Sequence, residues 1–163
     1  MAVGPWSWAD GLATWFLPTT DDERPTTFMP DTFQLEIVTP EKMVVRDVAE
    51  EIQIPGKQGY LGVLPGHAPL ISELAVGEIT YRNGNTTHCL AVAWGFAEVL
   101  PDKVTILAET AERANEIDTN RAQAAKQRAE ANLANSATEE DCQRVTSDLQ
   151  RAETRLEVAE KKY

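Results

Sequence analysis

The chain has 163 residues, 42% of them hydrophobic, and a formal net charge of −11. This length and composition predict one ordinary globular domain, or one domain with an appendage. A surface of this charge repels phosphate backbones and anionic lipid, which argues against nucleic-acid binding and against direct docking on membranes.

Residues 1–30 are predicted to form an N-terminal extension. Trp8, Leu12 and Trp15 follow helical spacing, and the polar segment 18–25 has the composition of a linker. Two interpretations stay open: a transient helix in a flexible tail, or a helix that docks on a partner.

The same segment lacks the features of a secretory or membrane-spanning sequence. No Lys or Arg precedes Arg24, and Asp10 interrupts the apolar run. Elsewhere, no stretch of the chain is long and apolar enough to span a bilayer. We therefore expect a cytoplasmic protein without direct membrane insertion, which reaches a membrane only through partners.

Residues 31–110 are predicted to form strands joined by turns. Apolar and polar residues alternate there, and Gly and Pro recur at short intervals. The Asn83-Gly84 step between residues 78–82 and 88–99 is a strong hairpin signal. Many short strands at regular spacing indicate an antiparallel β-sandwich or barrel.

Residues 111–163 predict an α-helical hairpin. They contain neither Gly nor Pro and are rich in Ala, Glu, Arg and Gln, which are good helix formers. The segment 135–138 interrupts this pattern, and Ser136 and Thr138 are each followed three residues later by an acidic residue, as helix N-caps often are. The apolar stripe is thin and mostly alanine, so we expect the hairpin to move relative to the strands. The expected fold class is α+β.

The sequence carries no constellation typical of an enzyme. It has no phosphate-binding loop, no dinucleotide fingerprint and no nucleophile elbow. Cys89 and Cys142 lie far apart and have no metal-ligand spacing. We therefore expect no catalytic residue, no metal site and no required cofactor.

One group of charged residues is a candidate binding site. Asp118, Arg121 and Arg128 share a face of the first predicted helix, and Arg151 and Arg155 share a face of the second. The two groups can converge in an antiparallel hairpin, where several guanidinium groups on one surface suit phosphate binding. The alternative is ordinary ion pairing on helix surfaces.

The segment 54–70, IPGKQGYLGVLPGHAPL, is the most specific pattern in the chain. Residues 35–40, 94–99 and 104–113 add further ordered matches. Together these segments resemble the epsilon subunit of bacterial and chloroplast rotary ATP synthases. The resemblance runs from Phe33 to the C-terminus and implies an N-terminal antiparallel β-sandwich followed by a C-terminal α-helical hairpin.

The resemblance implies a non-catalytic central-stalk subunit of a proton-translocating ATP synthase, peripheral at the cytoplasmic face of the bacterial inner membrane. The sandwich would bind the gamma subunit. A loop would contact the membrane ring of c subunits, although His67 in this loop also fits a simpler role as a turn cap. The residues of this loop are Leu64, Pro65, Gly66 and His67.

The resemblance also makes the hairpin a regulatory element. In the family, the second helix can extend into the catalytic alpha/beta head and hinder ATP hydrolysis. Some bacterial members bind ATP on the folded hairpin as a regulatory ligand, through an Ile/Leu-Asp-x-x-Arg-Ala motif that the segment 117–122, IDTNRA, resembles. The positions implied for ATP are Glu112, Asp118, Arg121, Arg128, Arg151 and Arg155.

Two other kinds of protein stay open as alternatives. One is a free-standing ligand-binding β-domain with a helical lid, and the other is a small enzyme. Neither needs a loop of the 54–70 type, so that loop favours the rotor subunit.

Overall fold

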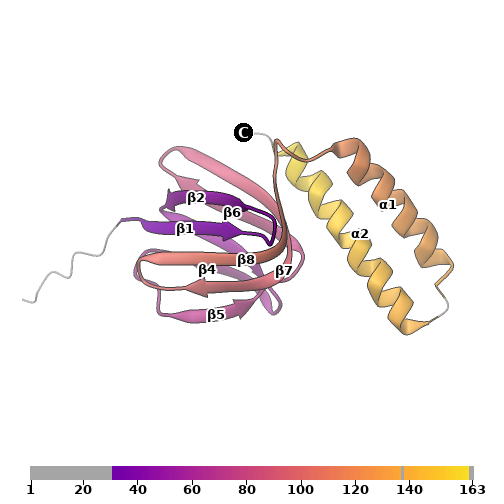
Figure 1. Ribbon diagram of the computed structural model, residues 1–163, viewed down its shortest axis with the longest axis horizontal. Coiled ribbons are helices and arrows are strands. Elements are labelled where there is room, and N and C mark those ends of the chain that lie inside the picture. The colour runs from indigo at the N-terminus through magenta and orange to yellow at the C-terminus, as the bar shows by residue number, and fades with distance from the viewer. Residues whose placement is uncertain (1–30, 137, 162–163) are drawn as a thin grey trace, which may run out of the picture.

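A β-sandwich carries a helical hairpin at one end (Figure 1). The computed structural model describes residues 31–136 and 138–161, and the predicted extension of residues 1–30 lies outside this range. Within it the chain forms eight strands followed by two helices, which confirms the predicted order of elements. The elements are β1 (Phe33–Val38), β2 (Met43–Ala49), β3 (Glu51–Gly56), β4 (Gly59–Val63), β5 (Leu70–Glu73), β6 (Gly77–Asn83), β7 (Thr86–Val99), β8 (Lys103–Arg113), α1 (Thr119–Ala134) and α2 (Glu139–Glu160).

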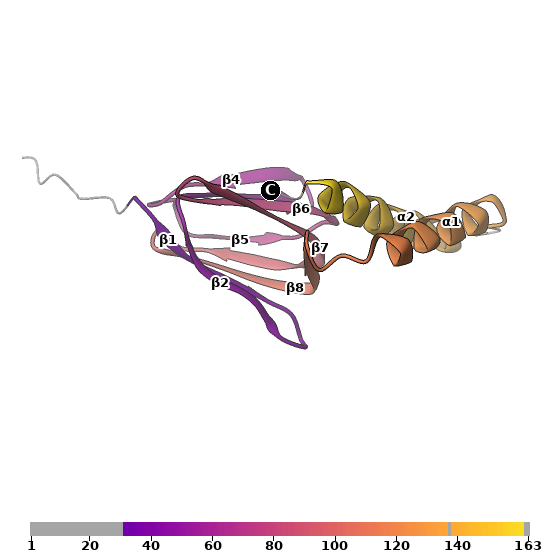
Figure 2. The ribbon, with the colours of Figure 1, turned by 90° about the horizontal axis from the view of Figure 1, so that it is seen from above.

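A single sheet bends into both layers of the sandwich (Figure 2). The strand order is β2-β1-β8-β7-β6-β3-β4, and β5 pairs with the second half of β7. The first half of β7 pairs with β6, so β7 passes from one layer to the other near Gly95. Gly95 has a φ of 117°, and a Cβ added there would lie 1.9 Å from the backbone oxygen of Leu107. Only glycine fits this corner.

The prediction of an antiparallel sandwich is wrong for one strand pair. β1 and β8 run parallel, with Leu35 opposite Val104 and Ile37 opposite Ile106. The other strand pairs are antiparallel. The alternation of apolar residues shows which side chains face inward, but it carries no information about the direction of the neighbouring strand.

The core lies between the two layers of the sandwich. In β1, Phe33, Leu35 and Ile37 are each no more than 2% exposed, and the residues between them face outward. This is the alternation that the sequence predicts for a half-buried strand. The largest fully buried side chains include Tyr81, Leu35, Ile37, Ile52, Ile54, Leu74, Ile79, Leu90 and Ile106.

Side-chain caps begin both helices of the hairpin. Asp118 accepts a hydrogen bond from the backbone N–H three residues later (3.0 Å), and Thr138 does the same at the start of α2 (3.1 Å). The prediction of Thr138 as an N-cap is confirmed. Ser136 instead donates to the backbone oxygen of Asn132 (3.0 Å) at the end of α1. Three acidic residues in the first turn of α2 also stabilise the helix through their interaction with the positive end of its dipole.

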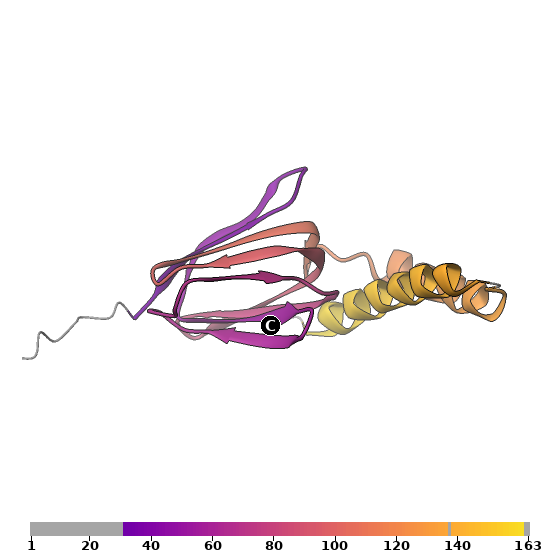
Figure 3. The same cartoon turned by 90° about the horizontal axis from the view of Figure 1, so that it is seen from below.

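The hairpin docks on the sandwich through the C-terminal half of α2 (Figure 3). Here α2 packs against β6 and β7. The apolar part of this contact is small, which agrees with the thin stripe in the sequence. It consists of Cys89, Ala91, Ile117, Val158 and Ala159.

Candidate ligand site between the sandwich and the hairpin

Glu112 on β8 joins the sandwich to both helices. Its Oε2 accepts a hydrogen bond from Arg121 Nη2 on α1 (2.7 Å), and its Oε1 accepts one from Arg155 Nε on α2 (2.8 Å). The Glu112 side chain is 22% exposed. Charge-assisted hydrogen bonds of this kind are stronger than neutral ones. Glu112 therefore links β8, α1 and α2 where the hairpin meets the sandwich, a region called the junction below.

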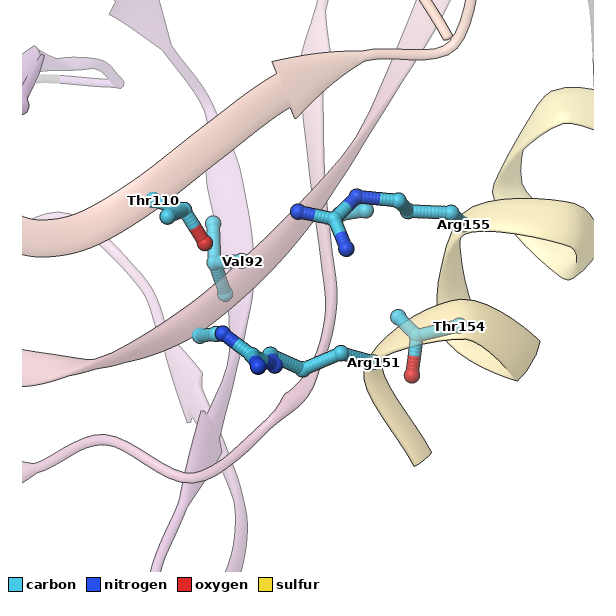
Figure 4. A pocket seen from close by; sticks show the side chains of 7 residues that line it. Val92, Thr110, Arg151, Thr154 and Arg155 are labelled. Carbon is cyan, nitrogen blue, oxygen red and sulfur yellow. The ribbon is translucent and has the colours of Figure 1, made fainter. Parts of the chain in front are cut away.

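Arg128, Arg151 and Arg155 line a pocket of about 310 Å³ between α1 and α2. Arg151 and Arg155 also border a cavity of about 10 Å³ against β7 and β8, where their side chains reach towards Val92 and Thr110 (Figure 4). Three guanidinium groups thus converge where the helices meet the sandwich. The other residues that line the larger pocket are Ala125, Ala129, Asn132, Val145 and Asp148.

Arg151 is the least satisfied of these arginines. Its Nη2 donates to Asp148, and its Nε is buried without a hydrogen-bond partner in the described chain. Its guanidinium lies over the ring of Trp94, with Cζ 4.7 Å from the ring centroid. Arg128, by contrast, is exposed and donates only to a backbone oxygen of its own helix, at Ala124 (3.3 Å).

The predicted ATP-site residues therefore divide into two groups. Arg128, Arg151 and Arg155 share the pocket. Glu112, Asp118 and Arg121 are not among its lining residues. Asp118 caps α1 with Oδ1, and Arg121 pairs with Glu112.

Two contacts that hold the C-terminal half of α2 and the residue after it on the start of β6 carry no signal in the sequence. Gln150 Nε2 donates to the backbone oxygen of Val76 (3.2 Å), and Lys161 Nζ donates to Glu78 (2.5 Å). Burial raises the pKa of Glu78, but hydrogen bonds from Lys161, Cys89 and Thr80 outweigh it and hold this pKa below its usual value. Burial also raises the pKa of the Cys89 thiol to about 11, with a smaller contribution from Glu78.

The predicted ring-contact loop forms a tight turn at the far end of the sandwich. His67 N donates to the Leu64 oxygen (3.1 Å), with Pro65 and Gly66 between them and a φ of 78° at Gly66. This is the pattern of a type II turn. Gly66 N also donates to the Pro101 oxygen (2.8 Å), which fixes the loop to the β7–β8 turn. The Leu64 side chain is 59% exposed.

Other polar groups of the sandwich serve its packing. The Tyr81 hydroxyl donates to Asp47 (3.3 Å), its ring stacks on His88 with centroids 4.7 Å apart, and burial raises its pKa to about 12. Over residues 31–136 and 138–161, no cluster of His, Cys, Asp or Glu is arranged to hold a metal ion. The helices of this same part are too short or too polar to cross a membrane.

The fold and the junction define a class of protein, a β-sandwich with a docked two-helix appendage. Two family models match the chain: "ATP synthase, Delta/Epsilon chain, beta-sandwich domain" over residues 32–114 and "ATP synthase, Delta/Epsilon chain, long alpha-helix domain" over residues 115–160. The chain therefore belongs to the ATP synthase delta/epsilon chain family.

Curated relatives carry the name ATP synthase epsilon chain. The one from Koribacter versatilis is 68% identical over 111 residues, which cover 68% of this chain and 78% of the relative. The one from Syntrophobacter fumaroxidans is 51% identical over 133 residues, 82% of this chain and 99% of the relative.

Solved structures share the fold. A chain of the Euglena gracilis mitochondrial ATP synthase has a TM-score of 0.70 at 23% identity, covering 96% of this chain and 99% of that one. A chain of the Tetrahymena thermophila mitochondrial ATP synthase has a TM-score of 0.55 at 13% identity, covering 78% of this chain and 96% of that one.

Proposed function

We propose that this chain is a non-catalytic central-stalk subunit of a bacterial proton-translocating ATP synthase. It would join the gamma subunit to the membrane ring of c subunits, and it would lie at the cytoplasmic face of the inner membrane through these partners. Membership of the family supports this role. The two solved structures that share the fold are of ATP synthase assemblies that contain a c-ring and a central stalk, which agrees with it. The observation that carries the binding role is an exposed apolar row on the sandwich.

The apolar row consists of Met43, Val38, Leu107, Phe96 and Ile71. Leu107 lies opposite both Phe96 and Val38, and Val38 lies opposite Met43. Ile71 on β5 lies opposite Glu98, two residues along β7 from Phe96, and so points to the same face. Residues opposite each other on paired strands point to the same face. Leu107 and Phe96 are each 56% exposed and Ile71 is 73% exposed. Contiguous exposed apolar surface marks interaction sites, and this row is the proposed gamma-binding face.

The test is binding of gamma by Leu107→Asp and Phe96→Asp variants. Each charge would be buried at the interface, so we expect a loss of affinity of about tenfold or more. Tyr60→Asp is the matched control, because Tyr60 is 60% exposed on β4, away from the row. Gamma binding unchanged in both row variants would contradict this face. A chain that did not co-purify with gamma and the catalytic subunits would favour a free-standing ligand-binding domain.

We further propose that the hairpin regulates ATP hydrolysis and binds ATP as a regulatory ligand. The convergence of Arg128, Arg151 and Arg155 on one pocket supports this, because guanidinium groups suit phosphate oxygens. Arg151 and Arg155 cannot also contact the catalytic head while the hairpin stays docked. A ligand that binds only the docked state stabilises that state, by about 2.7 kcal/mol at a hundredfold excess over Kd.

Calorimetric titration of the isolated protein with ATP tests this second role. Arg128→Ala removes one guanidinium group without a strong effect on the helix, and we expect about tenfold weaker binding. Arg144→Ala is the control, because Arg144 is exposed and pairs with Asp141 outside the pocket. No binding by the wild type at millimolar ATP, or equal affinity of wild type and Arg128→Ala, would contradict the proposal.

A further inference from the structure

Trp94 stands at the corner where β7 passes between the layers. Its φ of 51° makes it the one non-glycine residue with a positive φ among residues 31–136 and 138–161. A bulky L-residue is strained in this conformation, whereas glycine adopts it freely. The backbone therefore gives no reason for tryptophan at this position, and the reason has to lie in what the ring contacts.

The ring contacts Arg151 on α2. The guanidinium carbon lies 4.7 Å from the ring centroid, well within the distance of about 6 Å at which a cation is attracted to an aromatic face. Arg151 has only Asp148 as a hydrogen-bond partner for its side chain in the described chain, and its Nε is buried without one. The Trp94 ring is therefore the group of the sandwich that attracts the Arg151 charge.

We propose that Trp94 is a positioning residue, which holds Arg151 against the sandwich and so stabilises the docked state of the hairpin. The inference rests on the proposed function in one respect, namely that the hairpin can undock. Arg151 follows Gln150, whose side chain donates to the backbone oxygen of Val76 on the sandwich. Loss of the ring should therefore release α2 without disturbing the distant core.

Cys89 provides a direct measure of docking. It is 7% exposed and packs with Ile117, Val158 and Ala159, which all lie beyond the last strand. Undocking removes this cover and exposes the thiol. Cys142 is exposed, so replacing it with serine leaves Cys89 as the single thiol. The rate at which N-ethylmaleimide modifies Cys89 then reports the undocked population, provided that opening is fast relative to modification.

Two substitutions distinguish the effect of losing the Trp94 ring from the effect of the strained backbone at this position. Trp94→Ala and Trp94→Gly both remove the ring, but only Ala keeps the strained backbone. We expect both to raise the modification rate by a similar factor, about twofold to thirtyfold, as loss of a cation–π contact allows. Thermal unfolding should still distinguish them, with the Gly variant unfolding at the higher temperature. If Trp94 acted only through the backbone of the corner, the less stable of the two variants would also be modified faster. Equal modification rates despite different unfolding temperatures therefore assign the effect to the ring.

A double substitution tests whether the ring acts through Arg151. Arg151→Met alone should raise the modification rate about as much as Trp94→Ala, and the two together should raise it no further, because both remove one contact. Trp94→Phe keeps a weaker aromatic face, so its rate should lie between those of wild type and Trp94→Ala. Additive effects of Trp94→Ala and Arg151→Met would overturn the proposal.

Val158→Asp tests whether the hairpin undocks at all, independently of the role of Trp94. It places a charge under the docked helix, and we expect rapid modification of Cys89 while the sandwich stays folded. If Cys89 is modified rapidly in Val158→Asp but at the wild-type rate in Trp94→Ala, the hairpin can undock but Trp94 does not hold it. If Cys89 stays protected in folded Val158→Asp, the undocking itself is wrong, and the inference falls with it.

Discussion

Glu112 is the residue at which the sandwich and both helices meet. Glu112→Gln keeps the shape of the side chain but removes the charge that pairs with Arg121 and Arg155. Both pairs are partly exposed, so we expect docking to weaken by only about 1 kcal/mol. Modification of Cys89 in the Cys142→Ser background should accelerate about fivefold.

Glu109→Gln is the control for this prediction. Glu109 lies on the same strand and is exposed, so its charge contributes little to docking and the Cys89 rate should stay at the wild-type value. Equal rates in the Glu112 and Glu109 variants would mean that the two ion pairs of Glu112 contribute nothing to the docked state.

Gly95 has a backbone role that no other residue can fill. A Cβ would collide with the Leu107 oxygen, and the φ of 117° excludes an unstrained side chain. We expect Gly95→Ala to lower the free energy of unfolding by about 3 kcal/mol or more. Gly62→Ala, on a strand with nothing within 4 Å of the added Cβ, should be nearly neutral. Urea unfolding of the two variants makes this comparison, and similar midpoints would show that the corner can relax.

At the scale of elements, α2 depends on an ion pair near its C-terminal end. Hydrogen bonds hold the pKa of Glu78 below its usual value in the folded protein. A carboxyl group with a lowered pKa contributes stability above its unfolded pKa, and this contribution is lost as pH falls through the folded pKa. We expect the difference in unfolding free energy between wild type and Glu78→Gln to be largest at pH 7.

The same difference should shrink as pH falls below the ordinary glutamate pKa of about 4.3. Protonated glutamate then resembles glutamine, so the two proteins converge. Urea unfolding at several pH values from 7 down to about 2.5 measures the difference, because the contribution is lost between the unfolded pKa and the lower folded pKa. A difference that stays constant over this range would show that Glu78 does not act through its charge.

Most elements are predictable because their signals are local. Thr138 caps α2, and the strands alternate as the sequence does. The segment Asn83-Gly84-Asn85, predicted as the turn between two strands, contains the observed turn. Asn83 itself pairs with Thr86, so the loop holds only Gly84 and Asn85. The parallel pairing of β1 with β8 has no local signal at all, since it joins the two ends of the sandwich in sequence.

The candidate site is predictable to the same extent. Helical spacing places Arg151 and Arg155 on one face, and the structure brings Arg128 to the same pocket. The contact of Arg151 with Trp94 depends on how α2 lies across the corner of β7. The bond from Lys161 to Glu78 joins residues 83 positions apart. Helical periodicity orders side chains around one helix, and it carries no information about which strand that helix meets.

At the scale of the molecule, the sandwich separates the predicted ring-contact loop from the hairpin. Leu90 lies opposite Arg113 at the hairpin end of β7 and β8, and Val99 lies opposite Val104 at the other. The nine residue steps between these pairs span at most roughly 30 Å, because β7 turns near Gly95. Gly66 bonds to the β7–β8 turn at the far end. The predicted ring-contact loop and the hairpin therefore lie at opposite ends of the sandwich, so that each can be altered without the other.

This separation allows a selective test of the ring contact. Insertion of two residues between Gly66 and His67 destroys the type II turn and its hydrogen bond to Leu64, while the core of the sandwich stays intact. If this loop transmits the contact with the c ring, the insertion should leave ATP hydrolysis active but abolish most ATP-driven proton pumping. Both activities are measured in inverted membrane vesicles that carry the assembled complex.

The matched control is the same insertion between Gly84 and Asn85, in the turn at the other end of β7. Both sites are exposed turns that include a glycine with positive φ, so the cost to folding should be similar. Because the control turn lies away from the proposed ring contact, pumping should stay coupled to hydrolysis there. Full coupling with the insertion at Gly66, or equal loss of coupling at both turns, would show that this loop does not transmit the contact with the c ring.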